Sequence, residues 1–493
     1  MSSVQSTPAE PLAPVPESSK ALITVIVLCF GGLSASLMQT LVLPIQGELP
    51  KLLHTSAANA SWVITATLLG AAVAMPVAGR LADMFGKQRV LSVSAAVLLV
   101  GSVICALSDS LTPMLVGRTL QGLAMGFIPV GISLIREVTP PHMTGTAIAS
   151  MSATLGVGGA IGLPLSAWVA QDFNWHALFW MSAGLALIVT ISVVTLVPRV
   201  RDAVGGRLDV VGALGLAIGL VATLVAISKG NTWGWDDSKT LGLLAGGIVV
   251  LLVWGWYELR VTDPLCDLRV TGQAPVLLTN LAAVAIGFGM MAQAIVVPQL
   301  LQMPSATGFG LGQTILEAGL WMAPGGLMMM LFAPVSARLM RSTGAKVTLM
   351  LGAAVLGSGY VVAAFLMHAP WELLLASCIT SAGVGIGYAA MPTLILEAVP
   401  MREAASAVGI NSLMRSVGTT VASAVMAMLL TGSTEDLAGV PLPTEGAFRL
   451  CFVVGAVAAF VGVAIAATIP RAGNKAPESH QPQPVAVTVG EQA

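Results

Sequence analysis

The chain has 493 residues, of which 56% are hydrophobic and only 9% are charged, and its mean hydropathy is +0.89. A soluble domain carries about 25% charged residues, so this composition excludes a protein whose surface mostly faces water and indicates a membrane protein. The net charge of -1 gives no indication of a nucleic-acid partner.

Both ends of the sequence differ from the apolar middle. Residues 1–20 and 471–493 are polar and contain several prolines, and we expect both to be disordered tails. The N-terminal stretch lacks the basic region and small-residue cleavage site of a signal peptide, so the first apolar helix is expected to remain in the protein. The five cysteines are far apart and the five histidines show no ligand spacing, so we predict neither a disulfide nor a metal site.

Fourteen apolar segments follow one another along the chain, and a spanning helix takes about 20 residues. The first six are Ala21–Leu43, Ser61–Ala78, Val90–Leu107, Met114–Leu134, Ala147–Val169 and Leu178–Leu196. Two more are Val210–Ser228 and Leu241–Trp256. The last six are Pro275–Val297, Ala318–Ala337, Val347–Leu366, Leu373–Leu396, Ala405–Leu430 and Leu450–Ile469. We therefore predict an all-α membrane protein with fourteen transmembrane helices.

The distribution of basic residues predicts the orientation. If the N-terminus lies inside, sixteen Lys and Arg residues fall in inner segments and four in outer segments. Because basic residues concentrate on the cytoplasmic side, both termini are predicted to be cytoplasmic.

An internal repeat predicts the domain organisation. PVAGRLADMFGKQRVL (76–91) resembles PVSARLMRSTGAKVTL (334–349) at an offset of 258 residues. We predict a six-helix half at 21–196, a linker with two extra helices at 197–274, and a second six-helix half at 275–470. Parallel repeats of this kind bind substrate near the bilayer midplane and move one half against the other.

The segment GRLADMFGKQR after the second helix resembles the signature loop of the major facilitator superfamily. Gly79, Leu81, Asp83, Gly86, Lys87 and Arg89 carry the resemblance, and Arg80 is a further basic residue of the predicted latch loop. Such a loop implies a contact that closes the cytoplasmic side when it is made. We predict that Asp83 docks on a helix N-terminus or pairs with an arginine, and that the segment is a link between two helices.

Two more motifs support this resemblance and extend it to the fourteen-helix drug:proton antiporter branch. Arg118, Gln121 and Gly122 resemble the helix-4 motif RxxQG, which implies a role in coupling. Gly158, Gly162 and Pro164 resemble the helix-5 antiporter motif GxxxGP, with one extra residue before the proline. The helix-1 aspartate usual in the branch is absent, and Glu48 is the nearest acid, so Glu48 is our other coupling candidate.

Polar residues inside apolar segments are candidates for the substrate path, because polar groups in a bilayer are costly. They are Gln39, Thr40, Thr154, Asn280, Gln293, Asn411 and Arg415. Trp321 is a further substrate-path candidate, because it suits a deformable apolar pocket. Each is also open to a second interpretation, as a contact between helices. For Arg118 the alternative to coupling is a structural arginine that bonds backbone carbonyls.

The sequence thus predicts a secondary transporter that exports drugs or metabolites in exchange for protons by alternating access. The expected partners are a small amphiphilic substrate, protons and the lipid bilayer, with no cofactor, as a monomer in the inner membrane. The alternatives are an importer or uniporter of the same fold, and a membrane-embedded lipid-modifying enzyme. The chain contains no GxxxxGK[ST] motif, which argues against ATP as the direct energy source.

Overall fold

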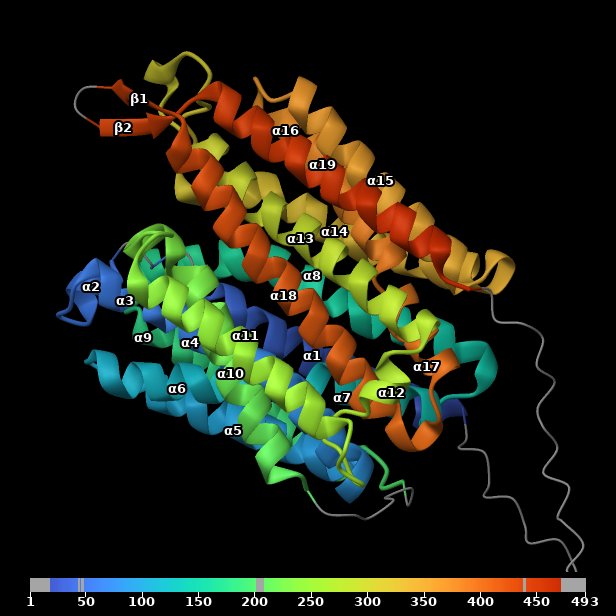
Figure 1. The fold of residues 1–493 in the computed structure, drawn as a ribbon. Coiled ribbons are helices and arrows are strands. Elements are labelled where there is room, and N and C mark those ends of the chain that lie inside the picture. Colours follow the sequence, from blue (N-terminus) through green and yellow to red (C-terminus); the bar gives the residue numbers. More distant parts are fainter. Residues whose placement is uncertain (1–17, 43–44, 46–47, 201–207, 438–439, 471–493) are drawn as a thin grey trace, which may run out of the picture.

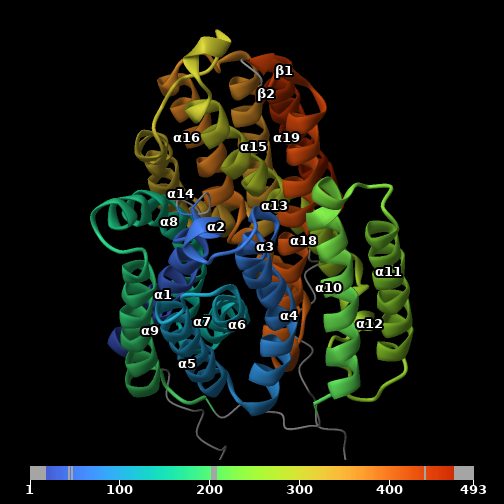
Figure 2. The ribbon, with the colours of Figure 1, turned by 90° about the vertical axis from the view of Figure 1, so that its left-hand side faces the viewer.

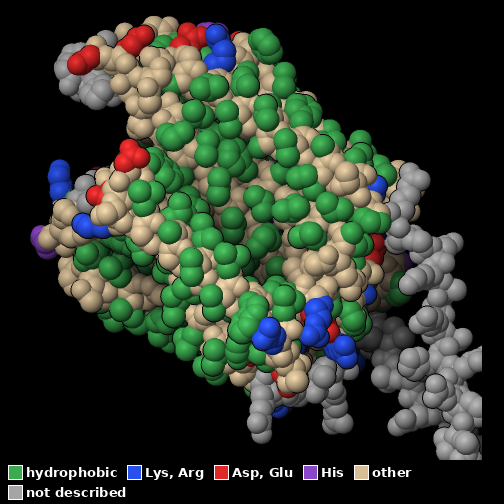
Figure 3. Space-filling view, in the orientation of Figure 1, with side chains coloured by type: hydrophobic (Ala, Val, Ile, Leu, Met, Phe, Trp, Pro, Cys, Tyr) green, Lys and Arg blue, Asp and Glu red, His purple; other side chains and the backbone are tan. Residues whose placement is uncertain are grey.

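The computed structural model describes residues 18–42, 45, 48–200, 208–437 and 440–470. Within these residues, fourteen helical segments are long and apolar enough to cross a membrane, which confirms the predicted number. The predicted tails lie outside the described residues except for 18–20, which already belong to the first helix. A band of hydrophobic side chains covers the middle of the molecule, and Lys and Arg gather mainly at one end (Figure 3).

Helices before the linker form one bundle (Figures 1 and 2). They are α1 (Ser18–Thr40), α4 (Trp62–Phe85), α5 (Lys87–Ala106), α6 (Leu111–Leu123), α7 (Phe127–Val138), α8 (Pro141–Asp172) and α9 (His176–Leu196). The 3-10 turn η1 (Ala124–Gly126) joins α6 to α7, and two short helices, α2 (Leu49–Leu52) and α3 (Ala57–Ala60), follow α1.

A second bundle comprises the helices after the linker. They are α13 (Ala274–Gln302), α14 (Ile315–Thr343), α15 (Ala345–Phe365), α16 (Pro370–Gly387), α17 (Ala390–Ala398), α18 (Ala404–Gly432) and α19 (Glu445–Thr468). Its other elements are η2 (Ser305–Thr307), η3 (Met401–Glu403) and an antiparallel hairpin that was not expected, β1 (Thr434–Leu437) with β2 (Val440–Pro443). The bundles meet where α8 packs on α14 and α4 packs on α18.

The extra helices α10 (Val210–Trp233) and α11 (Ser238–Glu258) lie at the side of the two bundles (Figure 2). α10 packs on α11, α4 and α18. Both helices run further than predicted, so they are not free of charged residues as the sequence ranges implied. Lys229 is 4% exposed within α10, where its Nζ donates to Ser61 Oγ at 2.5 Å and lies 4.6 Å from the Trp62 ring centroid.

Two predicted spans are not continuous helices, and a proline lies within four residues after each break. The span Met114–Leu134 is divided into α6, η1 and α7, and Leu373–Leu396 is divided into α16 and α17. A proline lacks an N–H, and its ring clashes with the carbonyl four residues earlier. Pro129 places that clash at Met125 in η1, and Pro392 places it at Tyr388, directly after α16.

The signature segment 79–91 is almost entirely helical, which corrects its description as a link between helices. α4 continues through Asp83 to Phe85, and α5 begins at Lys87. Gly86 alone separates them, with φ of +96°, a backbone conformation that favours glycine. The turn is confined to Gly86, so Asp83 still belongs to the last turn of α4 and its position is fixed by that helix.

Candidate functional site

A cavity of about 900 Å³ lies between the two bundles. Its walls come from both of them, with α1, α4, α7 and α8 on one side and α13, α14 and α18 on the other. The cavity extends toward the ends of α1 and α13, where Glu48 and Gln302 are exposed. The surface is indented at this end, between the β1–β2 hairpin and α2–α3 (Figures 1 and 3).

Polar side chains in the cavity include three of the eight predicted substrate-path residues, Gln39, Thr40 and Arg415. Hydroxyl groups at Ser416, Thr419, Thr420 and Ser423 continue the polar wall along α18. We did not predict these four, although positions three, four and seven residues after Ser416 share one helix face with it. Glu48, our second coupling candidate, is the one carboxylate among the described lining residues.

Apolar walls complete the cavity. Five methionines contribute to them: Met75, Met125, Met290, Met291 and Met322. Methionine is flexible and polarisable, so such a wall adapts to substrates of different shape.

The other five predicted substrate-path residues make helix contacts and do not line the cavity. Asn411 Nδ2 donates to Asn280 Oδ1 at 3.0 Å, and both residues are buried. Thr380 donates to Gln293 Oε1, and Trp321 Nε1 donates to Gln313 Oε1 at 3.0 Å. The Asn280–Asn411 and Gln293–Thr380 bonds fit the interhelical interpretation, because each joins two different helices. Trp321 instead bonds the segment directly before its own helix, and Asn280 Nδ2 has no partner among the described residues.

Thr154 bonds its own helix, since its Oγ1 donates to the Met151 carbonyl at 2.7 Å. It also packs closely on Gly32 of α1, where an added Cβ would lie 2.7 Å from the threonine oxygen.

Arg118 is fully enclosed by protein and lies outside the cavity, with 1% of its surface exposed. Its Nε donates to the Val63 carbonyl at 3.2 Å, and its Nη1 donates to the Met38 carbonyl at 3.0 Å and to Gln121 Oε1 at 2.8 Å. Gly122 lets α6 approach α4, because an added Cβ would lie 2.3 Å from the Thr67 carbonyl oxygen. This geometry matches the structural interpretation of Arg118, and its coupling role stays a prediction.

The glycine-rich helix α8 packs between α1 and α14. An added Cβ at Gly158 would lie 2.5 Å from the Ser36 side chain, and one at Gly162 would lie 2.0 Å from Thr40 Oγ1. Pro164 stands opposite Gly319 of α14. The two glycines thus let α8 lie close to α1 within the same bundle, whereas Pro164 faces Gly319 at one of the two junctions between the bundles.

The opposite end of the molecule is closed where α4 crosses α18. Asp83 is 3% exposed, and its carboxylate accepts hydrogen bonds from the backbone N–H of Ala405 at 3.2 Å and of Ser406 at 2.8 Å. These are the first free N–H groups of α18, where a negative charge is favoured. Gly79 faces the same helix end, and an added Cβ there would lie 2.4 Å from the Ala405 carbonyl oxygen. We call this contact of Gly79 and Asp83 with the start of α18 the gate.

The basic residues of the signature occupy different positions around the gate. Lys87 is buried, pairs with Glu137, and has its Nζ 3.7 Å from Asp83 Oδ1. Arg80 is half-buried and lines a smaller cavity of about 290 Å³ beside the gate, whereas Arg89 is exposed. The signature therefore contributes the Asp83 carboxylate to the gate. Lys87 partly balances the charge of this carboxylate, so Asp83 is not an isolated buried charge.

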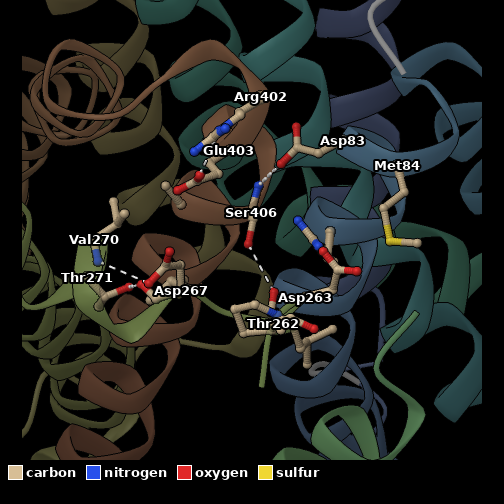
Figure 4. Close-up of a pocket in the computed structure, with 15 residues that line it drawn as sticks. Asp83, Met84, Thr262, Asp263, Asp267, Val270, Thr271, Arg402, Glu403 and Ser406 are labelled. Carbon is tan, nitrogen blue, oxygen red and sulfur yellow. Dashed lines mark hydrogen bonds and ion pairs between the residues drawn. The ribbon is translucent and has the colours of Figure 1, made fainter. Parts of the chain in front are cut away.

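The link after α11 covers the gate, which the sequence did not predict (Figure 4). Leu265 and Cys266 are 1% and 2% exposed, and Ser406 Oγ donates to the Leu265 carbonyl at 3.4 Å. Burial raises the pKa of the Cys266 thiol, with Glu258 acting in the same direction. Since Ser406 also donates its N–H to Asp83, the link and α4 bind the same residue of α18.

Two carboxylates lie close together behind this link. Asp209 Oδ1 accepts from Gly212 N at 2.8 Å and from the Tyr257 hydroxyl at 3.2 Å, and Glu258 Oε2 accepts from Cys266 N at 3.4 Å. The other two oxygens face one point, since a Cβ on Gly212 would lie 2.4 Å from Asp209 Oδ2 and 2.5 Å from Glu258 Oε1. Neither has a hydrogen-bond partner among the described residues. Like charges in this position repel unless a proton is held between them.

Two helical bundles around a central cavity that is closed at one end define the class of membrane transporters. The chain belongs to the major facilitator superfamily, whose sequence profile matches residues 28–423 and 279–490. This is a family of transporters and not of enzymes, so the lipid-modifying enzyme considered from the sequence is wrong.

The relatives of known sequence are distant, and their names describe different functions. An uncharacterised transporter of this superfamily from Mycobacterium tuberculosis is 32% identical over 306 residues, which cover 61% of this chain and 44% of that protein. The chain thus spans less than half of the length of this relative. The tetracenomycin C resistance and export protein of Streptomyces glaucescens is 27% identical over 84% of this chain and 77% of its own length. The human organic anion transporter MFSD10 shares the fold, with a TM-score of 0.62, 14% identity, and coverage of 90% and 99%.

Proposed function

We propose that the protein exports small amphiphilic molecules across the inner membrane by alternating access, driven by the proton gradient. The observation that carries this proposal is the contrast between the two ends of the molecule. The cavity reaches exposed residues at one end, while the Asp83 contact closes the other. A transporter needs this asymmetry, because a site that is open to both sides would leak.

The orientation proposed is with both termini in the cytoplasm and the cavity open to the outside. Lys and Arg at the gate end support it, because basic residues favour the cytoplasmic side (Figure 3). The tetracenomycin C resistance and export protein, a relative of this chain, supports export as the direction of transport. An importer or uniporter with the same cavity remains the alternative, and the measured direction of coupling distinguishes them.

Glu48 is the coupling residue that we propose, since it is the one carboxylate among the described residues lining the cavity. It is exposed at the mouth of the cavity, so its carboxylate is in contact with the solution on that side. Glu48→Gln should abolish proton movement that depends on substrate and leave substrate binding largely unchanged. Proton-coupled export by the variant at the rate of the original protein would exclude this role.

The test of the function is a transport assay in proteoliposomes with an imposed pH gradient. It uses a panel of lipophilic cations, neutral drugs and amphiphilic anions, each with the gradient in both directions. We expect substrate to move against its own gradient only when protons move the opposite way. Movement together with protons would show an importer, and movement that ignores the gradient would show a uniporter.

The two repeats are proposed to be residues 21–196 and 275–470, with α10 and α11 outside the pathway. In support, none of the described lining residues of the cavity belongs to α10 or α11. Lys239→Cys on α11 should therefore react with a membrane-impermeant thiol reagent at the same rate with and without substrate. Gln302→Cys, which lies on the cavity wall, is the matched site that substrate should protect.

A further inference from the structure

The guanidinium of Arg415 faces the cavity from the middle of α18. Only 9% of the residue is exposed, yet it belongs to the cavity wall. Among the described residues, Arg415 has no carboxylate within salt-bridge distance and its side chain makes no hydrogen bond. An arginine carries five N–H donors and stays charged, so the protein leaves this group unneutralised and its donors available.

Neighbouring residues hold Arg415 in this position. The guanidinium carbon lies 4.5 Å from the centroid of the Tyr388 ring, which supports the cation from one face. The stem of the arginine packs on Gly287 of α13, where an added Cβ would lie 3.0 Å from Arg415 Cγ. Tyr388 is 1% exposed, and its hydroxyl has no partner among the described residues. The arginine is therefore fixed by packing on the cavity wall, while its N–H groups have no hydrogen-bond partner among the described residues.

The charges around the cavity are unequal. Its described lining residues contain two charged side chains, Arg415 at depth and Glu48 at the exposed mouth. The remaining lining residues are apolar or neutral and polar. An isolated buried charge is costly, whereas a ligand that brings a counter-charge and accepts the free N–H groups removes that cost.

We propose that Arg415 forms an anion subsite and that the transported molecules are amphiphilic anions with a carboxylate or sulfonate group. This inference rests on the proposed function, and it names the substrate class. The acidic group binds the guanidinium through two parallel hydrogen bonds. The apolar part lies against the methionine wall formed by Met75, Met290 and Met322. Lipophilic cations should be poor ligands, because they meet an unpaired positive charge inside the cavity.

The test compares three dansyl compounds that differ in charge. They are dansylglycine, which is anionic, dansylglycinamide, which is neutral, and dansylethylenediamine, which is cationic. Binding is measured by fluorescence to the full chain in nanodiscs of neutral phosphatidylcholine. We expect dansylglycine to bind at least about tenfold more tightly than the amide, which corresponds to about 1.4 kcal/mol. The amine should bind most weakly.

Two substitutions separate charge from shape. Arg415→Gln should remove the preference for dansylglycine and leave the affinity for the amide within about twofold. Arg415→Lys should keep the sign of the preference. Arg341→Gln removes an exposed arginine away from the cavity and should change nothing. Size-exclusion chromatography reports whether each variant is folded, and the three compounds on the original protein test the proposal even if a variant is not.

Equal affinity for the three compounds, or an anion preference that survives in Arg415→Gln, overturns the anion subsite. Selective binding without transport in proteoliposomes contradicts the proposed function and leaves the subsite intact. Transport of the amine at the same rate in the original protein and in Arg415→Gln supports the function and overturns the proposed substrate class.

Discussion

The Asp83→Asn substitution should open the gate without altering the cavity. Asparagine is the same size as aspartate, but it keeps one acceptor oxygen and turns an NH2 group toward the second backbone N–H. The variant therefore loses one of the two bonds to Ala405 and Ser406, which measure 3.2 and 2.8 Å, and the charge at the helix N-terminus. A hydrogen bond to a charged group contributes about 1.5–3 kcal/mol.

The lower end of that range applies here, because Lys87 lies 3.7 Å from the carboxylate and already offsets part of its charge. A loss of about 1.5 kcal/mol lowers the ratio of closed to open gates roughly tenfold. Substrate affinity should change little, since Asp83 does not line the cavity. Turnover should fall, because the state closed toward the cytoplasm becomes less populated. Asp83→Lys should have a larger effect, because it places a cation against a positive helix end.

Gate opening is measurable with spin labels on two exposed positions at the gate end, Arg89 and Ser342, in a cysteine-free background. Electron–electron double resonance gives the distance distribution, and transport rate and substrate affinity are measured beside it. We expect the long-distance population to increase in Asp83→Asn. Arg341→Ala at the repeat-equivalent position is the control, since Arg341 is exposed. An unchanged distribution with a normal rate, or a joint collapse of rate and affinity, would refute this account of Asp83.

Three further outcomes follow from the same geometry. Arg118→Lys should lower the melting temperature in detergent, because lysine cannot serve the acceptors now bound by Nε and Nη1; normal transport per folded molecule in this variant would remove Arg118 from coupling. Glu258→Gln should raise the melting temperature, because the amide removes the repulsion from Asp209 and can donate to its unpartnered oxygen; a decrease would contradict the close approach of the two carboxylates. Gly79→Ala should lower turnover by forcing α4 away from α18, whereas Gly145→Ala, where an added Cβ meets nothing within 4 Å, should not; equal rates in the two variants would count against the crossing.

The number of membrane-spanning segments followed directly from the sequence, because the length of an apolar run is a local property. The ends and internal breaks of the helices were harder to predict from the sequence. The end of α4 depends on a glycine turn, and the breaks before α7 and α17 lie close to prolines inside long, mostly apolar runs. The hydrophobicity of a segment indicates neither the turn at Gly86 nor the breaks near these prolines.

The candidate site divides in a similar way. A signature identified Asp83, but its partners lie more than 300 residues away, and no pattern in the sequence indicates that pairing. Polarity alone did not separate Gln39 and Arg415, which line the cavity, from Asn280 and Asn411, which bond each other. Both kinds of residue interrupt an apolar run, and only the packing of the bundles decides which of them faces a partner and which faces the cavity.

A carboxylate suits a gate that must break as readily as it forms. A purely apolar contact of the same area would gain free energy on closing and would offer no group that water can take over on opening. The Asp83 oxygens and the two N–H groups of α18 can each exchange their protein partner for water, so the net difference between the bonded and the hydrated state is small. Alternating access requires such a difference, because two states that differ by a few kcal/mol are both populated during a cycle. The close backbone crossing of α4 and α18 at Gly79 adds packing contact in the closed state. The Asp83 bonds then determine how strongly the closed state is favoured over the open one.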